Sequence, residues 1–251
     1  MTCVSPSWPL SPKTPILERD EIHVWRTSLD LPASRMQTLQ QTLTADEQAR
    51  AGRFYFPRHR AHFIAARGVL RDILSRYLNR EANQLCFCYN AYGKPSLVGD
   101  FDGGLLCFNV SHSHGLALYA VTHRRAVGID VEHICSDFAN EQIAERFFSP
   151  REVVALRALP SHLQTDAFFN CWTRKEAYIK AKGKGLSIPL HGFDVSLAPG
   201  EPAALLRTQW DSQEVTRWSL QELNPGSGYV GAVAVEARDW QLKCWQWRAA
   251  L

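Results

Sequence analysis

Two short polar signatures constrain this chain more than any other feature, because the fold has to bring them together if they act as one site. The first is VGIDVE, an apolar, β-branched run typical of a strand, in which Asp130 and Glu132 point to the same side. The second, about forty residues later, is WTRKEAYIKAKGKGL, which predicts a helix with Glu176 and Lys180 one turn apart on one face. Three carboxylates that converge suit a hard divalent cation, and a lysine beside them suits the phosphate that such a cation bridges. Together the signatures suggest chemistry on a magnesium-bound pyrophosphate.

Each signature also has a simpler structural interpretation. Asp130 and Glu132 are compatible with the solvated face of an edge strand, which is the commoner setting for two isolated acids. Glu176 and Lys180 are compatible with an ordinary surface pair on a helix, which contributes only about 0.3–0.5 kcal/mol. The choice between these interpretations depends on whether the rest of the chain supplies the other parts of a phosphate site.

The composition excludes several classes of function. The chain has 251 residues, of which 45% are hydrophobic and 21% charged, and its net charge is only +3. This charge is too small for bulk attraction to nucleic acid or to a membrane to be the main function. No uninterrupted apolar run reaches the length of a membrane-spanning helix. Seven scattered cysteines without a CxxC pair predict reduced thiols and a cytoplasmic location instead of a zinc site or a disulfide framework.

The order of the expected elements indicates an α+β fold. Residues 1–20 are expected to form a flexible leader, because the segment is rich in Ser and Pro and lacks the apolar core of a signal peptide. We predict an N-terminal lobe over 21–125 and a C-terminal lobe over 126–251 that carries the metal site. The lobes are expected to be similar α/β units forming a pseudodimer, each with a long helix packed on a small antiparallel-rich sheet. Helices are expected at 34–43, 45–53, 58–78, 138–147, 150–159 and 165–182, and strands at 21–29, 85–89, 106–110, 116–122, 126–131, 193–197, 203–206, 216–220, 229–235 and 241–247.

Three further segments supply groups that can bind phosphate. The strand at 106–110 runs into Ser111 and His112, which can donate hydrogen bonds to phosphate oxygens, although a simple hairpin turn explains them equally well. Lys94 lies in a Gly-Lys-Pro turn, a setting that is also common in exposed loops. Arg67 flanks the apolar stripe of the helix at 58–78 and Arg50 precedes that helix, so both guanidinium groups are candidates for phosphate binding or for a solvated rim.

Taken together, these segments resemble the 4′-phosphopantetheinyl transferases, in particular the larger, pseudodimeric type that activates surfactin synthetase and similar enzymes. The resemblance extends from about residue 44 to residue 186, and the strands after it match only in pattern. It is carried, in family order, by GKP at 93–95, NVSHS at 109–113, GIDVE at 128–132, RFFS at 146–149 and WTRKEAYIK at 172–180 followed by GKGL at 183–186.

This resemblance implies an enzyme, a holo-[acyl-carrier-protein] synthase, that transfers the 4′-phosphopantetheine group of coenzyme A to a serine of an apo carrier protein or carrier domain. The leaving group is 3′,5′-adenosine bisphosphate. By the same resemblance, Asp130, Glu132 and Glu176 are expected to bind magnesium, with manganese possible, and Lys180 is expected to contact the phosphate under attack. Glu176, or a metal-bound water that it positions, is expected to take the serine proton.

The resemblance also implies a coenzyme A site. Ser111 and His112 are expected to contact phosphates of coenzyme A, whereas Arg50, Arg67 and Lys94 are expected around its 3′-phosphate and adenine. A monomer is expected to suffice, because one chain contains both lobes. Two alternatives are a non-catalytic coenzyme A-binding homologue and a nucleic-acid-binding protein that uses the arginines and aromatic residues at 50–71. The occupied metal and lysine positions argue against the first, and the low net charge argues against the second.

Overall fold

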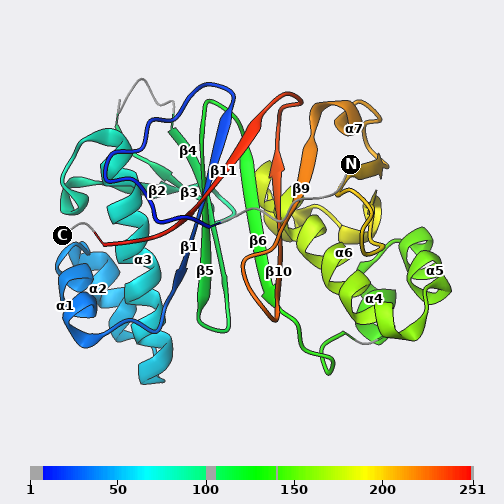
Figure 1. The fold of residues 1–251 in the computed structure, drawn as a ribbon, viewed down its shortest axis with the longest axis horizontal. Helices are drawn as coiled ribbons and strands as arrows, with labels where there is room; N and C mark the ends of the chain where they lie inside the picture. Colours follow the sequence, from blue (N-terminus) through cyan, green and yellow to red (C-terminus); the bar gives the residue numbers. More distant parts are fainter. Residues whose placement is uncertain (1–7, 100–105, 140, 250–251) are drawn as a thin grey trace.

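The computed structural model describes residues 8–99, 106–139 and 141–249. Two sheets lie side by side at the centre of the molecule, and helices cover their outer flanks (Figure 1). The fold is therefore α+β with a long helix on each sheet, as predicted. The elements in chain order are β1 (Glu21–Ser28), α1 (Ala33–Gln41), α2 (Ala45–Gly52), α3 (Pro57–Leu78), β2 (Phe87–Tyr89), β3 (Pro95–Leu97), β4 (Leu106–Ser113), β5 (Leu116–His123), β6 (Val127–His133), α4 (Glu141–Phe147), α5 (Pro150–Ala158), α6 (Ser161–Lys182), β7 (Phe193–Val195), β8 (Leu205–Thr208), α7 (Glu214–Arg217), β9 (Ser219–Leu223), β10 (Tyr229–Val235) and β11 (Gln241–Gln246).

The two central sheets have the orders β11-β1-β5-β4 and β6-β10-β9. Every neighbouring pair in them is antiparallel except β1 and β11, which run parallel. Strands β2 and β3 form a small antiparallel pair, as do β7 and β8. The sheets are therefore antiparallel-rich, in agreement with the sequence analysis.

Because side chains alternate between the two faces of each strand, the core has three separate parts. On β5, Leu118 and Ala120 face the inner surface of β6 and β10, whereas Tyr119 and Val121 face α3. On β6, Ile129 faces the other sheet, so the alternate positions of this strand face α6. The molecule is therefore layered as α3, sheet, sheet and α6, and the acidic positions of β6 lie on the α6 side.

Local sequence signals set several helix ends. The backbone N–H of Thr44 donates to Glu47 Oε2 (3.1 Å) at the start of α2, and Ser149 with Glu152 forms a capping box at the start of α5. Helix α6 ends at Gly183, whose φ of +66° is the left-handed conformation that glycine adopts readily. These signals explain why the predicted starts of α2 and α5 and the predicted end of α6 agree with the observed ones.

The last strand departs from the predicted lobe organisation. β11 was expected in the C-terminal lobe, but it pairs with β1 and so lies in the sheet of the first half, with Trp25 opposite Trp245. The described part of the expected leader lies along the same strand, because Ser11 N donates to Gln246 O (3.0 Å) and Gln246 N donates to Pro9 O (2.7 Å). Residues 1–7 of the leader lie outside the described residues, and the lobe boundary near residue 125 stays a prediction.

One predicted strand is partly wrong. The segment 216–220 was expected to be a strand, but Thr216 and Arg217 belong to α7 and only Ser219 onward is extended. The carboxylate of Glu214 is buried and accepts hydrogen bonds from Tyr178 Oη (2.5 Å) and Lys182 Nζ (2.8 Å). These tertiary contacts hold the segment helical and outweigh the strand preference of its side chains.

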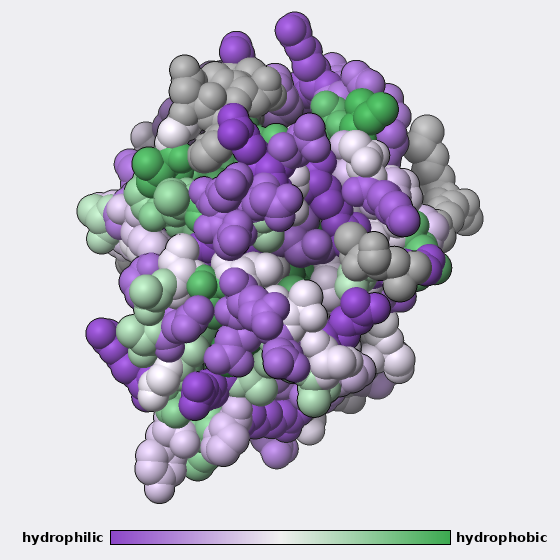
Figure 2. All heavy atoms as spheres, turned by 90° about the vertical axis from the view of Figure 1, so that its left-hand side faces the viewer, coloured by the Kyte–Doolittle hydropathy of each residue, from purple (hydrophilic) through white to green (hydrophobic). Residues whose placement is uncertain are grey.

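The outer surface agrees with a globular protein. The face that carries α1, α2 and α3 is largely hydrophilic, with small separate apolar patches (Figure 2). In the described parts of the chain, no helix combines the length and apolar character needed to span a membrane. All six described cysteines are unpaired, and Cys3 lies outside the described residues.

Candidate active site

The close packing of α6 against β6 brings the two polar signatures together. A Cβ atom at Gly128 would lie 2.1 Å from Ala177 O and 2.3 Å from Ala181 N, so the strand and helix backbones touch at this point. Only glycine permits this approach. Because α6 lies so close, Glu176 and Lys180 are held beside the face of β6 that carries the acidic residues.

Asp130 is the centre of a buried polar cluster, and its side chain is only 3% exposed. Its Oδ1 atom accepts hydrogen bonds from Lys180 Nζ (2.6 Å) and from Ser111 Oγ (2.8 Å). Lys180 Nζ also donates to Ser111 Oγ (3.0 Å). The buried Oδ2 atom of Asp130 has no hydrogen-bond partner among the described residues. Residues from β4, β6 and α6 thus meet at one carboxylate that has an unused oxygen.

The other two carboxylates lie close enough to repel Asp130. Glu132 Oε2 accepts a hydrogen bond from Ser113 Oγ (2.8 Å), and burial together with the charge of Asp130 raises the pKa of Glu132. Burial raises the pKa of Glu176 to about 7, with the charge of Asp130 adding to the effect and that of Lys180 opposing it. The cluster therefore holds three carboxylates with one ammonium group, an excess of negative charge that burial makes costly.

The three predicted metal ligands fit a divalent cation chemically, although they are not arranged as a finished site. Among the described residues, no group of three or more His, Cys, Asp or Glu side chains is assembled to hold a metal ion. A bound cation would nevertheless give the unused oxygen of Asp130 a partner. It would also offset the repulsion of Asp130 with Glu132 and Glu176. Binding of one metal ion by all three carboxylates would require side-chain shifts, because the described side chains are not assembled around one point.

A cleft of about 620 Å³ lies next to this cluster. Its basic lining includes Arg50, Arg67 and His112, and the described residues that line it include no carboxylate. Burial lowers the pKa of His112, and the positive charge of Lys180 lowers it further. The lower pKa favours neutral His112, so the positive charge of the cleft comes from arginines such as Arg50 and Arg67, and the cleft suits an anionic ligand. The residues that line it are Arg50, Phe54, Arg58, His59, His62, Phe63, Ala66, Arg67, Leu70, Pro95, Val110, His112, Ser113 and His114.

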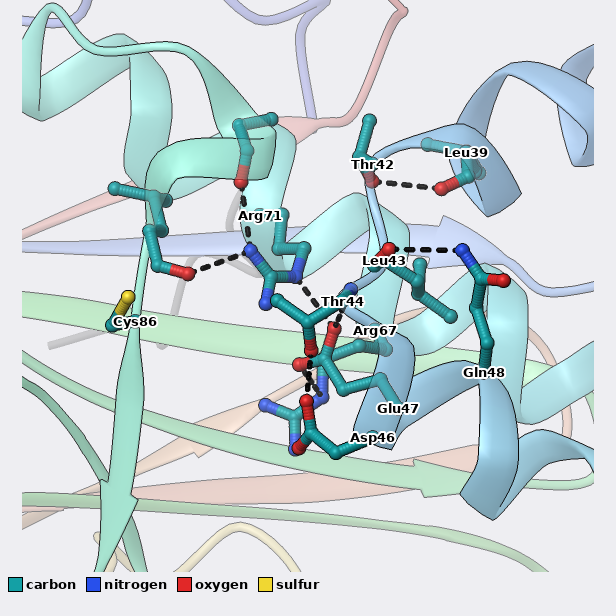
Figure 3. A network of polar contacts seen from close by, with 12 residues as sticks. Leu39, Thr42, Leu43, Thr44, Asp46, Glu47, Gln48, Arg67, Arg71 and Cys86 are labelled. Atoms are coloured by element: carbon teal, nitrogen blue, oxygen red, sulfur yellow. Dashed lines mark hydrogen bonds and ion pairs between the residues drawn. The ribbon is translucent and has the colours of Figure 1, made fainter.

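A buried network fixes Arg67 at the wall of the cleft (Figure 3). The carboxylate of Glu47 pairs with Arg67 Nε through Oε1 (3.3 Å) and with Arg71 Nε through Oε2 (2.8 Å). The Arg67 guanidinium also donates to the Tyr89 hydroxyl and lies 4.9 Å from the centre of the Phe87 ring. Two guanidinium groups share one carboxylate, so the network leaves positive charge at the cleft.

Lys94 lies apart from the other predicted coenzyme A contacts. Its ammonium donates to Lys180 O (2.7 Å), Val127 O (3.0 Å) and Ala181 O (3.1 Å), and it does not line the 620 Å³ cleft. Burial lowers the pKa of Lys94 to about 8. The structure therefore brings Arg50, Arg67 and His112 to the cleft but directs Lys94 elsewhere, and its contact with coenzyme A stays a prediction.

Sequence reasoning missed several residues of this region. His59 and His62 line the cleft, and Glu47 orients Arg67, but none of them was a candidate. The Thr-x-x-Glu spacing of a capping box was a signal that Glu47 has a fixed side chain. The two histidines had no such signal, because a helix surface carries many polar residues without a function.

Comparisons with known proteins identify the family. Residues 25–124 match the family described as 4′-phosphopantetheinyl transferase, N-terminal, and residues 126–234 match the 4′-phosphopantetheinyl transferase superfamily. The chain is 46% identical over 241 residues to the 4′-phosphopantetheinyl transferase HetI of Nostoc sp., covering 96% of this chain and 98% of that protein. It is 33% identical to the putative 4′-phosphopantetheinyl transferase slr0495 of Synechocystis sp. (78% of this chain, 77% of that protein). It is 31% identical to the 4′-phosphopantetheinyl transferase Sfp of Bacillus subtilis (67% and 74%). The chain therefore belongs to the 4′-phosphopantetheinyl transferase superfamily and to its larger type.

Proposed function

We propose that this protein transfers the 4′-phosphopantetheine group of coenzyme A to a serine of an apo carrier protein and releases 3′,5′-adenosine bisphosphate. The observation that carries the proposal is the position of the cationic cleft directly beside the buried cluster around Asp130 and Lys180. The names of relatives that align over most of this chain support the same activity.

The cleft suits the charged part of coenzyme A. Arg67 is held in place by Glu47, and Arg50 lies against the Phe63 ring, 5.3 Å from its centre. Guanidinium groups fixed in this way lose little freedom when they bind a phosphate with two hydrogen bonds. We expect Arg50 and Arg67 to bind the 3′-phosphate end, with His112 and Ser111 nearer the pyrophosphate, because Ser111 also contacts the acidic cluster.

The reaction is a phosphoryl transfer with balanced bonds. The serine oxygen of the carrier forms a bond to the phosphorus that bears the pantetheine group, and the bond from that phosphorus to the bridging oxygen of the pyrophosphate breaks. The adenosine bisphosphate leaves with the electron pair, and the serine proton passes to Glu176 directly or through a water. Lys180 is positioned to neutralise the charge that develops, because its ammonium reaches both β4 and β6.

We infer that Asp130, Glu132 and Glu176 would hold magnesium or manganese during the reaction. When bound there, the metal ion would supply charge neutralisation on the pyrophosphate. One chain contains both the cleft and the carboxylates, so we propose that a monomer is sufficient. We also propose a cytoplasmic location, since the described cysteines are unpaired as in a reducing compartment.

Intact-mass spectrometry of an apo acyl carrier protein tests the proposal. The carrier would be incubated with this protein, coenzyme A and magnesium, with and without a chelator. A gain of one phosphopantetheine group that the chelator prevents would support the reaction and the metal together. No gain across several carriers, despite measurable coenzyme A binding, would favour a non-catalytic coenzyme A-binding protein and contradict the proposal.

A further inference from the structure

The turn between β2 and β3 makes direct contact with the C-terminal end of α6. Lys94 Nζ donates to the carbonyl oxygens of Lys180 and Ala181 in the last turn of the helix, at 2.7 and 3.1 Å. It also donates to Val127 O (3.0 Å) at the start of β6. All three N–H groups of this ammonium are therefore used, and none is left for a phosphate in this arrangement.

Asn90 makes a second, separate attachment between the same turn and the same helix end. Its Oδ1 atom accepts from Tyr92 N (2.9 Å) and Lys94 N (3.0 Å), which fixes the shape of the turn. Its Nδ2 atom donates to Gly183 O (2.7 Å), just beyond the helix. Gly93 has a φ of +83°, which a glycine adopts without strain. The turn at 90–94 therefore has a fixed shape, and both Lys94 and Asn90 attach it to the C-terminal end of α6.

These contacts lie at the C-terminal end of α6, where a helix leaves its own carbonyl groups without intrahelical partners. The last four carbonyl groups of a helix have no partner within it, and a cation near them also interacts favourably with the helix dipole. The Lys94 ammonium donates to two of these carbonyls in α6, of which Lys180 O also accepts from Gly183 N (3.2 Å), and ties them to β6. One acceptor is the carbonyl of Lys180 itself, so the contact fixes the backbone from which that side chain extends.

We propose that Lys94, supported by Asn90, is a positioning residue for Lys180 and not a phosphate contact. It sets the position of the last turn of α6 along β6, and so places the Lys180 ammonium against Asp130 and Ser111. The inference rests on the proposed function for the reaction that Lys180 serves. Loss of the contacts that Lys94 makes with α6 and β6 would leave coenzyme A binding in the separate cleft nearly unchanged, since Lys94 does not line it.

Steady-state kinetics of Lys94→Met distinguish the two roles. The matched control is Lys184→Met, which removes an equal charge from an exposed position just after the same helix. We expect kcat to fall at least about tenfold in Lys94→Met, because displacements of about 1 Å can cost roughly 100-fold, while the KM for coenzyme A changes less than about threefold. A large rise in KM with kcat retained would show a phosphate contact and overturn the proposal.

Amide hydrogen exchange gives a readout that does not depend on activity. We expect faster exchange at 179–184 in Lys94→Met and, more weakly, in Asn90→Ala, but not in the Lys184→Met control. Asn90→Ala keeps the Lys94 ammonium and serves if Lys94→Met does not fold. Unchanged exchange in both variants would overturn the proposal. If the wild-type protein shows no transfer, the proposed function fails, while the exchange result still decides the role of Lys94.

Discussion

Replacing Gly128 by alanine tests whether the contact between β6 and α6 builds the site. The added Cβ would lie 2.1 Å from Ala177 O, 2.3 Å from Ala181 N and 2.9 Å from Ala181 Cα. All three atoms belong to the helix backbone, so no side-chain rotation can relieve the overlap. To bring the shortest contact to about 3 Å, the strand and helix must separate by about 1 Å.

The expected effects follow from that displacement. Overpacking of this kind costs about 1–3 kcal/mol, which for a chain of this size lowers the melting temperature by roughly 2–12 °C. A shift of about 1 Å between catalytic groups can also lower turnover by roughly 100-fold. We therefore expect Gly128→Ala to lose both stability in thermal denaturation and kcat in a carrier-modification assay run well below its melting temperature.

Gly52→Ala is the matched control for this substitution. Gly52 ends α2, and no atom lies within 4 Å of the position that its Cβ would occupy. Alanine in a helix is favoured over glycine by about 0.5–1 kcal/mol, so this variant should be as stable as the wild type or slightly more stable. If Gly128→Ala kept the melting temperature and kcat of Gly52→Ala, the backbone contact between β6 and α6 would not be what positions the site.

Three further predictions concern individual side chains. Asp130→Ala should abolish transfer in the intact-mass assay while circular dichroism shows an intact fold, and near-wild-type turnover would refute its place at the metal. Lys180→Ala should mainly lower kcat and Arg67→Ala should mainly raise the KM for coenzyme A in steady-state kinetics. The reverse pattern would mean that the inner and outer phosphate contacts are exchanged. Glu47→Ala should lower the free energy of unfolding in denaturant titration by about 3–5 kcal/mol, because it leaves Arg71 as a buried charge without its carboxylate. Arg71 Nη1 also donates to Ala82 O and Leu85 O (2.8 Å each), and a loss below about 1 kcal/mol would show that these two carbonyl groups suffice.

Long elements could be predicted because local patterns decide them. The strand at 229–235 was predicted with its observed bounds, since its apolar residues run between turn residues. The helix at 165–182 ends where expected, at a glycine, although it starts earlier, at Ser161. The partner of β11 could not be predicted, because its parallel pairing with β1 joins segments about 220 residues apart in the sequence. Such a contact depends on the packing of the whole molecule and leaves no local signal.

The candidate site could likewise be predicted where local spacing decides it, but not where contacts between distant segments decide it. The i and i+2 spacing on a strand and the i and i+4 spacing on a helix predicted which side chains share a face, and the structure places Asp130 and Lys180 in contact. The direction of the Lys94 side chain was beyond such reasoning. A lysine in a turn can reach in many directions, and here the last carbonyls of a helix more than eighty residues later determine which one it takes. Glu47 similarly gains its role only when α2 packs on α3.

Strand β4 connects the two halves of the site through its alternation. Ser111 and Ser113, two residues apart, donate to Asp130 and Glu132, which are also two residues apart on β6. The position between the serines, His112, points to the other side of the strand and lines the cationic cleft, which Ser113 also borders. The pairing of Ser111 with Leu118 and of the next residue with Ala117 on β5 sets which side chain points which way. A shift of this register by one residue would turn the serines away from the carboxylates and the histidine away from the cleft. The register of one strand therefore fixes both the acidic cluster and the wall of the cleft, which is why they lie next to each other.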